Sequence, residues 1–116
     1  MNIEFIDLDH KNNIKHFKDK LYEPLQKNRE YLSAIYLLSK AHHSYIEYIE
    51  LNCIRFTDLF EGYQYNIAGS GERALVKLAA HLFNNQWEID LISCMSSLDE
   101  NNLEAAFKAM EIRFHR

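Results

Sequence analysis

Apolar residues recur every three or four positions along most of this 116-residue chain, which is the spacing that places them on one face of an α-helix. Turn-forming residues are scarce, with 3 glycines and 1 proline, and this argues against a turn-rich sandwich or barrel. We therefore predict a mainly α protein. Residues 1–116 would form a single compact domain of four or five helices, with at most one short two-stranded β-ribbon.

The first half of the chain contains two of these periodic stretches. We expect the first helix to be capped by Asp7 or Asp9 and to end near Tyr22, because Pro24 lacks an amide hydrogen and disfavours helix before it. The preceding residues 1–7 alternate between apolar and polar, as in a short strand or an extended lead-in. The second stretch runs from residue 28 to 53, as one long helix or as two that meet near residues 39–44.

The second half is punctuated by glycine and asparagine. Tyr63, Tyr65 and Ile67 alternate, which predicts a short extended segment, and Ser70 is expected to cap a helix that ends at residues 84–85. Residues 87–91 would be a strand or the entry to a turn, and the last helix would begin at Ser97 or Asp99. The side chains expected in the core are Phe17, Leu21, Ile35, Leu38, Leu78, Leu82, Phe107 and Met110. The stripe of the last helix is Leu103, Phe107, Met110 and Phe114.

The charge balance limits the choice of partner. Lys and Arg number 13 against 17 Asp and Glu, so the net charge is −4, which favours neither a nucleic-acid backbone nor an anionic membrane surface. The longest strongly apolar stretch, Leu78 to Phe83, is too short to span a bilayer. The first residues include an acid at position 4 and no long apolar run, so we expect no secretory signal peptide there. We expect a small acidic cytoplasmic protein that binds neither nucleic acid nor membrane directly.

Histidine and cysteine are the residues that could hold a metal. A zinc site built from His10, His42 or His43, Cys53 and Cys94 is chemically allowed, but the chain has no CxxC, HExxH or HxxxH spacing. We therefore favour surface histidines, two free thiols and no cofactor. A structural zinc protein is the alternative.

Two features raise the question of catalysis. Either cysteine could pair with a histidine, but a nucleophilic site also needs an oxyanion hole and an orienting group, for which no local signature is present. The segment from Gly69 to Arg73 is similar to a phosphate-binding turn but lacks the GxGxxG and GxxxxGK[ST] patterns. We favour a glycine-rich helix entry and predict no enzymatic activity. A small hydrolase or nucleotide-binding enzyme is the alternative.

Tyrosines gather in the middle third of the chain, among acidic residues. Exposed tyrosines commonly anchor protein interfaces, and the acids would steer the surface toward a basic partner. In a second interpretation these rings cover the core with their hydroxyls in water. Base stacking is a third, disfavoured by the shortage of lysine and arginine in residues 31–65. The residues proposed to bind a partner are Tyr45, Glu47, Tyr48, Glu50, Asp58, Glu61, Tyr63 and Tyr65.

Three stretches, taken together, suggest a family. They are residues 5–7 with His10, residues 70–84 and residues 109–114. Their order and spacing resemble those of a family of small proteins of unknown function from Gram-positive bacteria, their phages and mobile elements, in which Cys94 would match a cysteine-rich patch before the last helix. Small phage proteins of this kind often bind a host protein, including CRISPR effectors. The resemblance thus implies a non-enzymatic protein-binding module, an anti-CRISPR-like inhibitor of a host defence nuclease.

Overall fold

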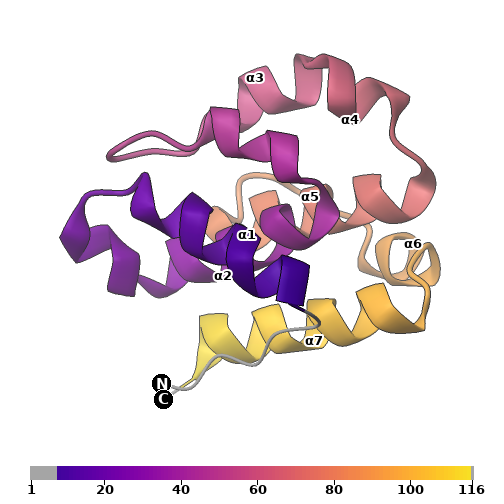
Figure 1. Ribbon diagram of the computed structural model, residues 1–116. Coiled ribbons are helices and arrows are strands. Elements are labelled where there is room, and N and C mark those ends of the chain that lie inside the picture. Colours follow the sequence, from indigo (N-terminus) through magenta and orange to yellow (C-terminus); the bar gives the residue numbers. More distant parts are fainter. Residues whose placement is uncertain (1–7, 116) are drawn as a thin grey trace.

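The computed structural model describes residues 8–115, and in this range the chain is mainly α-helical, as predicted. Four long helices form the body of the domain (Figure 1): α1 (Leu8–Asp19), α2 (Arg29–Ala41), α5 (Ser70–Phe83) and α7 (Glu100–Phe114). Shorter segments connect them: the 3₁₀ helices η1 (Glu23–Lys27) and η2 (His43–Tyr48), and the helices α3 (Phe56–Glu61), α4 (Tyr63–Ile67) and α6 (Leu91–Ser96). No strand forms within residues 8–115, where one isolated antiparallel bridge joins Ile49 and Ile54.

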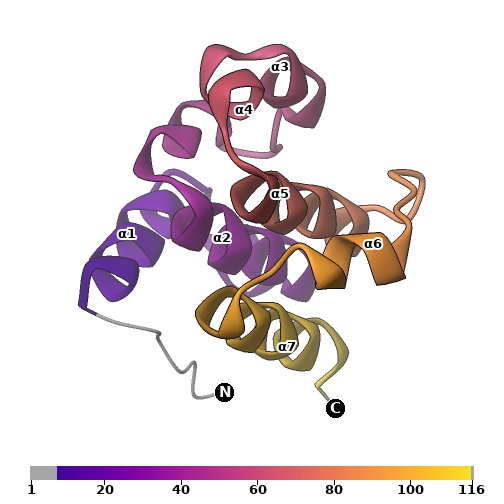
Figure 2. The same ribbon diagram turned by 90° about the vertical axis from the view of Figure 1, so that its right-hand side faces the viewer.

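Helix α2 is the centre of the fold. Figure 2 shows it surrounded by α1, α5 and α7, and every residue from Leu32 to Ser39 is buried. A helix that is apolar all round is typical of a protein interior. The side chain of Asn28 caps its first turn by accepting a hydrogen bond from the amide of Tyr31 at 3.2 Å.

The second periodic stretch forms two helices that meet near residues 39–44, which confirms one of the two expected arrangements. The backbone of His42 is extended and ends α2, and its Nδ1 accepts a hydrogen bond from the Ser44 amide at 3.1 Å. The chain then continues as η2. This 3₁₀ helix ends at Tyr48, and residues 49–53 are not helical.

Several element boundaries differ from those expected. Helix α1 ends at Asp19, earlier than Tyr22, and Asp9 lies inside the helix, not before it. The expected cap Asp7 and the expected extended lead-in lie outside the described residues. Gly69, not Ser70, is the cap of α5, whereas its end at residues 84–85 is confirmed by Asn84. Asp99, one of the two expected starts, caps α7 by accepting from the amide of Asn102 at 2.8 Å.

Of the two segments that could have been extended in the second half, residues 63–67 are helical and residues 87–90 are irregular. Tyr63 to Ile67 form α4, because Arg73 donates from Nε to the Tyr65 carbonyl at 3.0 Å and stabilises the end of this short helix. Gly62 separates α4 from α3, and a side chain there would collide with the Tyr48 hydroxyl. Residues 87–90 form no strand, and α6 begins at Leu91.

The core contains most of the side chains expected there. Phe17, Leu21, Ile35, Leu38, Leu78 and Leu82 are all buried, as predicted. The prediction was wrong for Phe107, which is 57 % exposed, and Met110 is only partly buried. Within the part of the chain that the structure describes, no helix is long and apolar enough to cross a membrane.

Helix α7 faces the core with the side opposite to the one predicted. Its buried residues are Ala105, Ala106, Ala109 and Ile112, three of them fully inaccessible alanines. The reason is steric, since α7 packs directly on the central helix α2 and small side chains allow the two backbones to approach closely. The two phenylalanines of α7, Phe107 and Phe114, are thereby left exposed, while Met110 packs partly against the core.

Candidate docking surface

Two tyrosines of the predicted partner-binding set are buried, which corrects their assignment as exposed anchors. Tyr45 is fully inaccessible and Tyr48 is 8 % exposed. The Tyr45 hydroxyl donates to Oε2 of Glu72 at 2.6 Å, and the same oxygen accepts from Nε2 of Gln64 at 3.0 Å. These bonds tie η2, α4 and α5 together, so Tyr45 is a structural residue. Burial, followed by the bond to Glu72, raises the pKa of the Tyr45 hydroxyl far above its usual value.

Removing the Tyr45 hydroxyl should therefore weaken the fold in a pH-dependent way. We expect Tyr45→Phe to lower the free energy of unfolding by about 1.5–3 kcal/mol at pH 7, the range for a hydrogen bond to a charged acceptor. Above about pH 10 the unfolded tyrosine loses its proton while folded Tyr45 keeps it, so this contribution declines as the pH rises. Urea denaturation should show that the free energy of unfolding falls less between about pH 7 and pH 10.5 in Tyr45→Phe than in the wild-type protein. Parallel declines in both proteins would contradict this role.

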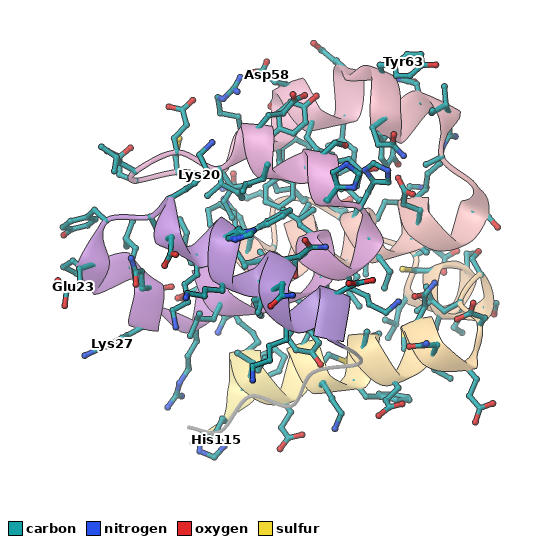
Figure 3. All side chains as sticks on the ribbon, in the orientation of Figure 1. Lys20, Glu23, Lys27, Asp58, Tyr63 and His115 are labelled. Atoms are coloured by element: carbon teal, nitrogen blue, oxygen red, sulfur yellow. The ribbon has the colours of Figure 1, made fainter. Side chains whose placement is uncertain are left out.

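Arg55 brings three of the remaining predicted residues together, because its Nη2 donates to the Glu47 carbonyl at 2.9 Å and its guanidinium also pairs with Glu50 and Asp58. Glu50 and Asp58 are exposed but both pair with Arg55, the latter at 2.8 Å, and Tyr65 is half-buried against Phe60. Glu47, Glu61 and Tyr63 are exposed, and Tyr63 has 79 % of its surface accessible. Asp58 and Tyr63 project from the α3–α4 edge, on the opposite side of the molecule from His115 at the end of α7 (Figure 3). The predicted set is therefore split into structural and solvent-facing residues.

The outer side of α7 carries the apolar surface that sequence reasoning had placed in the core. We call it the α7 face: Leu103, Phe107, Met110 and Phe114. Phe107 and Phe114 are 57 % and 64 % exposed, while Leu103 and Met110 are half-buried. A shallow depression of about 340 Å³ lies on this side. It is lined by Leu103 and Phe107, by the acids Glu100, Glu104 and Glu111, and by Lys108.

Arg113 connects the end of α7 to α5 and α2. Arg113 donates from Nε to the Leu82 carbonyl of α5 at 2.9 Å, and its Nη2 lies 3.6 Å from a carboxylate oxygen of Glu30 in α2. The same guanidinium lies 5.4 Å from the centre of the Phe114 ring. Arg113, the neighbour of Phe114 in the chain, is thus bonded to the body of the protein beside an exposed aromatic ring.

The sequence contains a signal for this arrangement. Ala105, Ala106, Ala109 and Ile112 form a second apolar stripe on the opposite side of the same helix. Periodicity alone favours the stripe with the larger side chains. The choice between the two depends on how closely α7 must approach α2, which is a tertiary property.

The structure does not bring the candidate metal ligands together. Nε2 of His10 lies 2.9 Å from the Tyr36 carbonyl, and the His42 and His43 rings stack on each other with 4.4 Å between their centres. Cys53 and Cys94 are free thiols, as predicted, and burial raises the pKa of the Cys94 thiol. No group of three or more His, Cys, Asp or Glu side chains suited to a metal ion occurs among residues 8–115.

The glycine-rich segment from Gly69 to Arg73 is occupied by structural contacts. Glu72 accepts from Tyr45, and Arg73 stabilises the end of α4, as described above. A cavity of about 360 Å³ beside this segment is lined by the cations Arg73 and Lys77 but also by Asp90, whose carboxylate opposes a bound anion. These contacts favour a helix entry over a phosphate site.

Comparison of the chain with protein-family models, with curated proteins and with solved structures finds no match.

Proposed function

We propose that this protein is a non-enzymatic protein-binding module that docks onto its partner through the α7 face. One observation carries the proposal: a 15-residue helix turns its largest apolar side chains away from the core. Burying an exposed phenylalanine side chain is worth about 1.5–3 kcal/mol, and clustered exposed apolar residues commonly mark interaction sites.

The charge around the α7 face indicates the class of partner. Three glutamates, Glu100, Glu104 and Glu111, line the depression on this face beside one lysine, Lys108, and the whole chain carries a net charge of −4. Acidic edges favour and steer a basic surface. The nucleic-acid channel of a host defence nuclease is basic, and such a nuclease is the target that the sequence resemblance implies. In its specific form, the proposal is that a phage or mobile-element protein inhibits such a nuclease by covering part of its basic surface.

A matched pair of variants tests the docking surface. We expect immobilised wild-type protein and Tyr63→Ser to capture the same protein from a host lysate, and Phe107→Ser to lose it. Both changes remove an exposed aromatic ring, one from α4 and one from α7, which lie on opposite sides of the molecule in Figure 1, so loss in one variant alone identifies the surface. The captured protein is then purified and its direct binding to both variants measured. Loss with Tyr63→Ser and retention with Phe107→Ser would contradict the proposal and favour the α3–α4 edge.

A further inference from the structure

The α7 face has the spacing of a coiled-coil seam. Leu103, Phe107, Met110 and Phe114 follow one another at intervals of four, three and four residues, which is the alternation of the a and d positions in a heptad repeat. An ordinary core-facing helix has a broader apolar stripe of three to four residues per two turns. Here the outward stripe is narrow, with the charged residues Glu104 and Glu111 along one edge and the buried Ala106 and half-buried Arg113 along the other. Such a seam fits the side chains of a second helix running along it.

We infer that the partner contributes a basic amphipathic α-helix, which packs along α7 in the manner of a two-stranded coiled coil. This inference rests on the proposed function and specifies the partner. The seam from Leu103 to Phe114 covers 11 residue intervals, or about 16 Å of helix axis. The partner helix therefore needs at least about three turns, with apolar residues in the same heptad spacing.

The charges beside the seam determine the polarity of the partner. With Leu103 and Met110 at d positions, Glu104 and Glu111 occupy the e positions, which flank the seam and select partners in coiled coils. Both are exposed, and neither forms an ion pair within the described residues. The complementary helix carries lysine or arginine at the positions that face this edge.

A second copy of this chain does not meet that requirement. In an antiparallel pair that matches the apolar residues, e positions face e positions, so Glu104 lies near Glu111 of the second copy. In a parallel pair, Glu104 faces Asp99 and Glu111 faces Ala106. Neither orientation supplies a cation to the glutamates, so the occupant is a helix of a different protein.

Synthetic helices provide a direct test. The probes are two peptides of about 21 residues, or three heptads, with leucine at every a and d position. One carries lysine at e and g and the other carries glutamate there. A third peptide repeats the lysine version with a central proline, which breaks a helix. Binding of each labelled peptide is measured by fluorescence anisotropy.

We expect wild-type protein to bind the lysine peptide at least about tenfold more tightly than the glutamate peptide or the proline peptide. The double variant Glu104→Lys/Glu111→Lys should reverse the preference between the two charged peptides. Glu61→Lys/Glu88→Lys changes the net charge equally at exposed residues outside α7, and it should keep the wild-type preference. Phe107→Ser should lose both peptides.

Three results would overturn the inference: equal binding of the charged peptides, equal loss of preference in both lysine double variants, or tight binding of the proline peptide. Sedimentation of wild-type protein as a dimer that Phe107→Ser dissociates would also overturn it, in favour of a second copy. If the peptides fail while the captured protein still depends on Phe107, the helical partner is wrong and the docking surface stands. If the captured protein binds Phe107→Ser as tightly as it binds the wild-type protein, the proposed function itself is wrong.

Discussion

Leu78→Ala should lower the free energy of unfolding by about 2–5 kcal/mol, whereas Phe107→Ala should leave it within about 0.5 kcal/mol of the wild-type value. Leu78 is 1 % exposed in the centre of α5, so truncation removes buried surface and leaves a cavity among neighbours that cannot fully relax. Phe107 is the larger side chain, but more than half of it already contacts water.

Urea denaturation of the two variants measures this contrast. The periodicity of the sequence places Leu78 and Phe107 alike in the core and thus predicts a large loss for both. The structure predicts a large loss for Leu78→Ala alone. A loss above about 2 kcal/mol for Phe107→Ala would show that α7 packs through the stripe expected from the sequence, and the docking surface would not exist.

Ala109→Leu should destabilise the protein by about 1–3 kcal/mol or more, because added atoms in a filled interface force backbones or rotamers to shift. Ala109 is fully inaccessible on the side of α7 that packs toward α2 and α5. A leucine there must push the helix away from its neighbours. Urea denaturation also measures this effect.

The matched control places the same residue on the other side of α7. Glu111 is exposed, and leucine is a good helix former, so Glu111→Leu should change the free energy of unfolding by no more than about 0.5 kcal/mol. Equal effects of the two leucines would contradict the close packing of α7. A neutral Ala109→Leu together with a destabilising Glu111→Leu would place the opposite side of the helix in the core.

Much of the fold follows from local sequence. The burial of α2 and α5 could be predicted from the sequence. Residues 32–39 and 74–82 have apolar side chains at helical spacing, and good caps or clear ends mark the two helices. The break after Ala41 was also predictable as one of two arrangements. What local sequence could not supply is the orientation of α7, since its two stripes are both apolar and only packing against α2 decides between them.

The predicted exposure of Tyr45 and Tyr48 is wrong for a related reason. Tyr45 reads as an exposed aromatic among acids, but its partner is Glu72, which lies 27 residues further along the chain. In the folded chain the Tyr45 hydroxyl donates a hydrogen bond to this carboxylate and the ring is buried. No local sequence pattern predicts this pairing. Tyr48 is likewise enclosed, so Tyr48→Ala tests stability and not partner binding. Tyr63 keeps its predicted exposure because α4 is short and turns that side chain outward.

The dissociation constant of the complex between this protein and its captured partner tests the docking surface most directly. Titration calorimetry compares wild-type protein, Phe107→Ser and Tyr63→Ser. We predict that Phe107→Ser raises the dissociation constant at least about a hundredfold, as expected for an aromatic anchor at the centre of an interface, and that Tyr63→Ser leaves it unchanged. Equal dissociation constants for wild-type protein and Phe107→Ser would contradict the assignment of the α7 face as the docking surface.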